Sequence, residues 1–182
     1  MRKLSFNIAL GGIISALCIL MMFLVSVLPF FVYVFPMLCS FLICIVYYES
    51  GLKISLITYL SVAILSLILS PDKESALIFT AFFGYYPMAK IFLDKMRYSI
   101  LRRVIKFALF NASVIASYYA LINIFGVVDM AEIGEGFGKY SVLILLVVAN
   151  ISFIAYDFAI GVLSVRYLAG WRKLLFKGIK TQ

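Results

Sequence analysis

The chain has no histidine, only three cysteines and only eight acidic residues among its 182 residues. Histidine is the commonest general base and metal ligand, so its absence removes the usual centre of acid–base chemistry. Cys18, Cys39 and Cys44 lie inside apolar runs and lack the spacing of a metal site or disulfide framework. These absences predict a protein that is not an enzyme and that holds no metal or other cofactor.

What the chain has is apolar residues, which make up 65% of it, whereas only 13% are charged. Soluble domains are about 45 to 50% apolar and about 25% charged, so this chain is matched to lipid. In lipid the backbone must satisfy its own hydrogen bonds, as helices or as a closed barrel. Continuous apolar runs such as 142–158 favour helices over the alternating pattern of a barrel. The predicted fold is an all-α, polytopic membrane protein.

Breaks in the apolar runs predict six transmembrane helices. Residues 4–48 contain no charge and would form a helix of about 67 Å, twice the hydrocarbon core, so they must turn once near Pro29 and Pro36. Gly84 and Pro87 predict a bent or broken fourth helix. The predicted helices, all within one domain spanning 1–182, are 5–28, 35–48, 54–70, 75–93, 104–127 and 140–165.

The distribution of charge predicts the orientation. With the N-terminus inside, Lys and Arg gather in the cytoplasmic connections and tail, and the acidic residues of 72–74 and 129–135 lie outside. The protein is therefore expected to span a cell membrane with both termini in the cytoplasm. The net charge of +8 is interpreted as membrane retention or as a docking surface for a cytoplasmic partner, with no nucleic acid implied.

Small residues recur at a spacing of four in the first helix. Gly12 and Ala16 share one helix face, and Gly11 and Ser15 share another. Such pairs let helices approach closely in lipid, either within one protein or between subunits.

With its first helix of the Ala-Leu-x-x-x-x-x-Ala-Leu kind at residues 9–17 and about six helices, the chain resembles the substrate-binding S-components of energy-coupling factor (ECF) transporters. The resemblance covers the whole chain in architecture but only 9–17 in motif, where Gly12 and Ala16 replace the usual alanine pair. It implies a small bacterial membrane protein that captures a vitamin or similar nutrient outside. It also implies first-helix contact with a transmembrane coupling subunit that carries two ATPases.

Polar residues inside the predicted helices are candidates for function. Lys90 and Asp157 lie at depths that differ by roughly 7 Å, so they are expected to form an ion pair, although Lys90 alone can snorkel to the headgroups. The aromatic segment 79–90 is either a wall for a planar ligand or a packing seam. The ligand-binding candidates are Tyr86, Tyr119, Asn123 and Asn150. The alternative for the last three is a hydrogen bond to a neighbouring helix.

Three functions remain at this point. The leading hypothesis is a nutrient-binding S-component without ATPase activity of its own, since the chain has no phosphate-binding Gly-rich loop. Its connections at 28–36, 70–74 and 129–139 would then cover the site as a lid. The alternative is a structural or interaction protein of a bacterial envelope complex. An intramembrane enzyme is third, because no nucleophile has a matching base.

Overall fold

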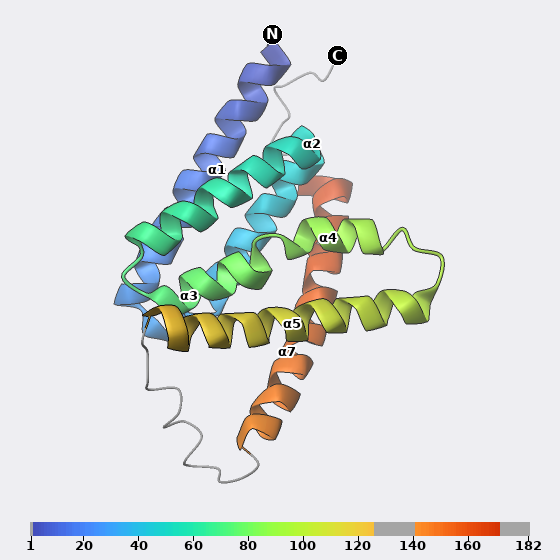
Figure 1. Cartoon of the computed structure of the whole chain (residues 1–182). Coiled ribbons are helices and arrows are strands. Elements are labelled where there is room, and N and C mark those ends of the chain that lie inside the picture. The colour runs from blue at the N-terminus through green and yellow to red at the C-terminus, as the bar shows by residue number, and fades with distance from the viewer. Residues whose placement is uncertain (1, 126–140, 172–182) are drawn as a thin grey trace.

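The computed structural model describes residues 2–125 and 141–171 (Figure 1). The predicted acidic connection at 129–139 and most of the basic tail lie outside these residues. The described chain is helical throughout, in agreement with the predicted all-α class. Its elements are α1 (Arg2–Val27), η1 (Pro29–Phe31), α2 (Val34–Leu69), α3 (Lys73–Ile78), η2 (Phe79–Phe83), α4 (Tyr86–Leu93), α5 (Ser99–Phe125), α7 (Ser141–Arg166) and η4 (Tyr167–Trp171).

Five helices in the described ranges are long and apolar enough to cross a bilayer. The outer surface of the molecule is itself apolar: Ile8 is 59% exposed, Ile68 70% and Phe158 72%. Lysine and serine side chains, by contrast, are buried inside, among them Lys90, Lys106 and Ser40. This inverts the arrangement of a water-soluble protein and fits lipid as the surrounding solvent. The five candidate spans are Leu4–Val27, Val34–Leu69, Lys73–Leu93, Ser99–Leu121 and Leu146–Gly170.

The long helix α2 is broken at Gly51, where the backbone adopts φ 82° and ψ 177°. Only glycine takes up this conformation readily, because a Cβ would clash with the neighbouring carbonyl oxygen. The chain reverses there, so that the arm 52–69 runs beside α1, with Thr58 near Gly11 and Ser70 bonded to the Met22 carbonyl (Figure 1). The turn predicted at 49–53 is confirmed.

The fourth predicted helix is broken, as Gly84 and Pro87 indicate. It consists of α3, the π-helical turn η2 and α4, and the Gly84 amide donates to the Phe79 carbonyl five residues earlier, at 2.7 Å. Pro87 lies in the first turn of α4, where its missing N–H leaves no bond unmade. The break places an aromatic segment in the centre of the protein.

One predicted boundary is wrong. The fifth helix was predicted to begin at residue 104, but α5 begins at Ser99. The Arg102 amide donates to the Tyr98 carbonyl at 3.1 Å, so Arg102 and Arg103 both belong to the helix. Arginine is a good helix former, and its charge does not end a helix that projects beyond the apolar layer.

The core is an aromatic cluster between η2, α4, α5 and α7. The Phe82 ring contacts Tyr86 at a centroid distance of 4.6 Å and Phe110 at 5.1 Å, and Phe110 stacks on Phe153 at 4.7 Å. Tyr156 completes the cluster against Phe83 at 4.9 Å. The segment 79–90 is therefore a packing seam in the described structure, which is the second of its two predicted roles.

Gly84→Ala is expected to destabilise the protein by about 1 to 3 kcal/mol. A Cβ at Gly84 would overlap the Tyr59 ring, and Tyr59 cannot swing aside freely because its hydroxyl donates to the Thr80 carbonyl at 2.8 Å. Thermal unfolding in mild detergent measures the effect. Gly12→Ala is the matched control, since a Cβ at Gly12 meets nothing within 4 Å. Equal melting temperatures for the two variants would contradict the packing described at η2.

Candidate functional site: a buried charge cluster and a cavity between two connections

Asp157 of α7 is the centre of a charge cluster inside the helical bundle. Its Oδ1 accepts bonds from Lys90 Nζ at 2.6 Å and from the Tyr86 hydroxyl at 2.6 Å, both on α4. Lys106 Nζ on α5 lies 3.1 Å from Oδ1 and 3.2 Å from Oδ2. One carboxylate thus joins three helices through charge-assisted bonds, which are stronger than bonds between neutral groups.

Asp94 supplies the second carboxylate of the cluster. Lys106 Nζ lies 2.8 Å from Asp94 Oδ1, and Lys90 Nζ lies 3.6 Å from Oδ2. Arg102 approaches the same carboxylate at 3.9 Å. Two lysines and two aspartates balance each other, and Arg102 leaves the group with one net positive charge at the exposed Asp94 end. Such a network holds helices in one arrangement.

The structure brings Lys90 and Asp157 together. Two further members of the cluster, Lys106 and Asp94, were not predicted from the sequence. Lys106 falls in the predicted helix 104–127 and Asp94 just after the predicted helix 75–93, and neither was predicted to contact a charge within the helices. The long lysine side chain lets Lys106 reach Asp157 from the second turn of α5. Lys106 is accordingly only 6% exposed. The one signal in the sequence was the scarcity of acidic partners for these lysines. Asp94 is the only acidic residue between positions 75 and 128.

The four predicted ligand-binding residues do not form one site. Tyr86 is fully buried in the aromatic core, and Tyr119 is 62% exposed on α5. Asn123 donates to the carbonyl of Tyr119 on its own helix, and Asn150 bonds to Asn111 at 3.1 Å. Their assignment to ligand binding stays a prediction: the structure buries Tyr86 among aromatic rings and bonds the two amides to groups of α5 and α7.

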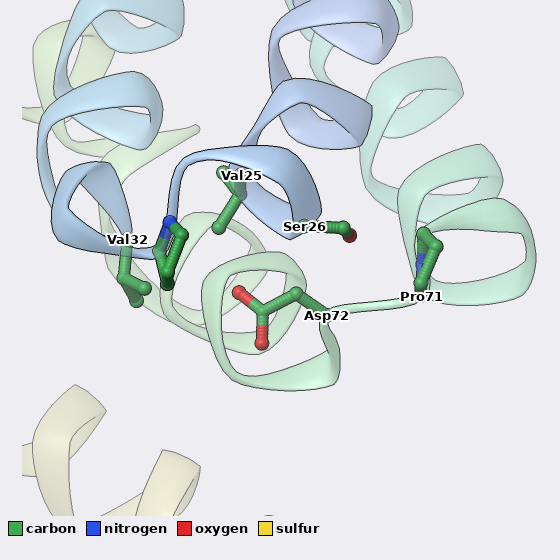
Figure 2. A pocket seen from close by; sticks show the side chains of 6 residues that line it. Val25, Ser26, Val32, Pro71 and Asp72 are labelled. Atoms are coloured by element: carbon green, nitrogen blue, oxygen red, sulfur yellow. The ribbon is translucent and has the colours of Figure 1, made fainter.

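A cavity of about 260 Å³ lies instead at the end of the bundle where two connections meet (Figure 2). We call it the connection cavity; it is shallow and largely open to its surroundings, and its lining residues are Val25, Ser26, Pro29, Val32, Pro71 and Asp72. Figure 2 shows the Asp72 carboxylate directed toward the space between Val25 and Val32. Asp72 also caps α3 by accepting the Ser75 amide at 3.2 Å.

A hydrogen bond ties the two connections together beside this cavity. The Tyr33 hydroxyl donates to Glu74 Oε1 at 2.9 Å. Burial, with the adjacent Glu74 and Asp72 charges, raises the pKa of Tyr33 to about 12. Its phenol therefore stays protonated at physiological pH and keeps donating to the carboxylate. This hydrogen bond fixes the connection between α1 and α2 against the connection between α2 and α3.

The small residues of α1 divide between two environments. Gly11 packs inward, where a Cβ would lie 2.8 Å from Thr58 Oγ1 on α2. Gly12 and Ala16 face outward, and Gly12 has open space around it. Close packing among the described residues therefore uses Gly11, whereas Gly12 and Ala16 are exposed there.

No family model, curated protein or solved structure matches the chain. Within the described residues, no group of three or more His, Cys, Asp or Glu side chains is placed to hold a metal ion. The geometry that bears on function thus consists of the charge cluster, the connection cavity and the outward face of α1.

Asp157→Asn is expected to lower the free energy of unfolding by roughly 2 to 3 kcal/mol, because it leaves Lys90 and Lys106 with only the half-exposed Asp94 between them. Asp94→Asn should cost less, since the Asp94 side chain is 42% exposed and water replaces part of its interaction. Thermal unfolding in one detergent compares the two. A larger loss for Asp94→Asn would place the centre of the network at the wrong carboxylate.

Proposed function

We propose that this protein is the membrane-embedded binding subunit for uptake of a vitamin or similar small nutrient, working with a separate ATP-driven module. In this role it resembles the S-components of ECF transporters. The ATPases and a transmembrane coupling subunit are its partners, and it hydrolyses no nucleotide itself. It acts as a multi-pass protein of the bacterial cell membrane.

The observation that carries the proposal is the outward Gly12–Ala16 face of α1. Small residues bring helices close together in lipid, yet both of these are exposed in the described chain, and a Cβ at Gly12 would meet nothing within 4 Å. A helix from another subunit can approach the backbone there without displacing a side chain. Contact with a coupling subunit through this face is the role that the resemblance implies.

The proposal includes six crossings and cytoplasmic termini. The reversal at Gly51 divides α2, which would otherwise be about 54 Å long, into two arms of bilayer-crossing length. Basic residues at 95–106 and at Arg166 then share the cytoplasmic side with the N-terminus. The connection cavity faces outward in this orientation, as capture of an external nutrient requires.

The connection cavity is the proposed nutrient site. Its volume of about 260 Å³ suits a small, compact ligand, and valine and proline side chains line it together with one carboxylate. Asp72 favours a ligand that carries a positive charge or donates hydrogen bonds. The Tyr33–Glu74 bond holds the cover that the connections at 28–36 and 70–74 would provide.

The second candidate is a structural or interaction protein of an envelope complex. The aromatic core favours it, because η2, α4, α5 and α7 pack against each other where a ligand cavity was expected. Purification of the tagged protein from its native membrane distinguishes the two functions. Mass spectrometry should find a coupling subunit with two ATPases and a bound nutrient; well-folded protein with neither would favour the structural role.

Ala16→Leu is expected to reduce recovery of the coupling subunit at least tenfold without lowering the melting temperature of the protein. The added side chain would keep a second helix away from the α1 backbone. Ala116→Leu on α5 is the matched control, since both alanines are exposed and the substitution is the same. Quantitative mass spectrometry of the purified complexes gives the ratio. Equal losses from both variants would remove the α1 face from the proposal.

Val32→Trp is expected to reduce nutrient retention at least tenfold, because the indole would occupy much of the connection cavity. Val34→Trp, two residues further along and outside the cavity lining, should retain the nutrient. The measurement is the amount of small molecule released per mole of denatured protein. Full retention by Val32→Trp would mean that the nutrient binds elsewhere.

A further inference from the structure

A second hollow runs along the side of α7, well away from the connection cavity. Its volume is about 710 Å³, and we call it the α7 groove. Apolar side chains and Gly161 form most of its lining. Its charged groups are Lys90 with Asp157, and Arg166 nine residues further along α7. The lining residues are Lys90, Ile154, Asp157, Phe158, Gly161, Val162, Val165 and Arg166.

The apolar part of the α7 groove is long enough to lie along most of an acyl chain. Ile154, Phe158, Val162 and Val165 recur at intervals of three or four, so they lie along one side of the helix. They extend for about 16 Å along its axis. Gly161 adds no side chain there, and its Cβ position lies 3.8 Å from the end of the Lys90 side chain.

The charges of the α7 groove favour an anion. The Asp157 carboxylate is already shared by Lys90 and Lys106, so it adds little free negative charge. Arg166 lies in the last turn of α7 and has no carboxylate partner among the described residues. A guanidinium at the end of a membrane helix lies at headgroup level and binds phosphate oxygens through paired N–H donors.

We propose that the α7 groove is a binding site for one anionic phospholipid. The headgroup phosphate contacts Arg166, and one acyl chain lies along Val165, Val162, Phe158 and Ile154. Lys90 and Lys106 are neutralised by Asp157 and Asp94, so Arg166 supplies the positive charge that the headgroup meets. The occupant is a lipid rather than a soluble anion, because the apolar lining continues far beyond the reach of a phosphate.

The test uses the full-length protein in nonionic detergent, titrated with phosphatidylglycerol or phosphatidylcholine of identical acyl chains and followed by native mass spectrometry. Phosphatidylglycerol is expected to bind at least fivefold more tightly. Arg166→Gln should abolish that preference, whereas Arg103→Gln, an exposed arginine outside the groove, should keep it. Equal affinity of the unaltered protein for both lipids would overturn the proposal, as would equal effects of the two substitutions.

A second pair of variants tests the acyl-chain path. Val165→Trp fills the groove from a position that is 67% exposed, so the fold should be unaffected and the affinity for phosphatidylglycerol should fall at least fivefold. Val147→Trp, at a 53% exposed position of the same helix outside the groove, should leave it unchanged. Unchanged binding by Val165→Trp would overturn the proposed path. Inorganic phosphate at millimolar concentration should not compete; full displacement by it would mean that the site recognises a free anion.

Discussion

The shared Asp157 carboxylate is the interaction on which the arrangement of the second half of the chain depends. An unpaired charge inside an apolar medium costs several kcal/mol, so each charge must reach an opposite one. Lys90, Lys106 and Tyr86 all meet Asp157, which brings α4, α5 and α7 to one point. Apolar packing in lipid has little preference for one helix over another, whereas these charges specify both the partners and their depth.

The aromatic core lies immediately beside this cluster and is consistent with it. Tyr86 belongs to both, since its ring packs against Phe82 and its hydroxyl bonds to Asp157. The break at Gly84 lies between η2 and α4, whose aromatic residues pack against α5 and α7. The break in the helix at Gly84 and the dense aromatic packing therefore lie side by side in the structure.

The two hollows of the molecule differ in the chemistry that they offer. The connection cavity is small, lies between two connections and presents the Asp72 carboxylate, which suits a compact donor or cation. The α7 groove is long and apolar and ends at a guanidinium, which suits an anionic lipid. The Gly12–Ala16 face on α1 is a third exposed surface, and it offers neither a hollow nor a charge but close access to a helix backbone. The charge cluster holds the scaffold between them.

The sequence by itself determined the features that depend on composition and local backbone chemistry. The apolar content predicted membrane helices. Gly51 and its polar neighbours predicted the turn within 49–53, and Gly84 with Pro87 predicted the broken fourth helix. It also indicated that Lys90 and Asp157 would meet, because an intramembrane charge needs a partner.

Only the tertiary structure decided which side chains share a space. Tyr119 faces outward while Tyr86 is buried, and Asn150 bonds to Asn111 rather than lining a cavity. In lipid both faces of a helix are apolar, so the sequence pattern does not separate the buried face from the exposed one. The connection cavity and the α7 groove arise from the way segments distant in the chain pack together, which no local pattern specifies.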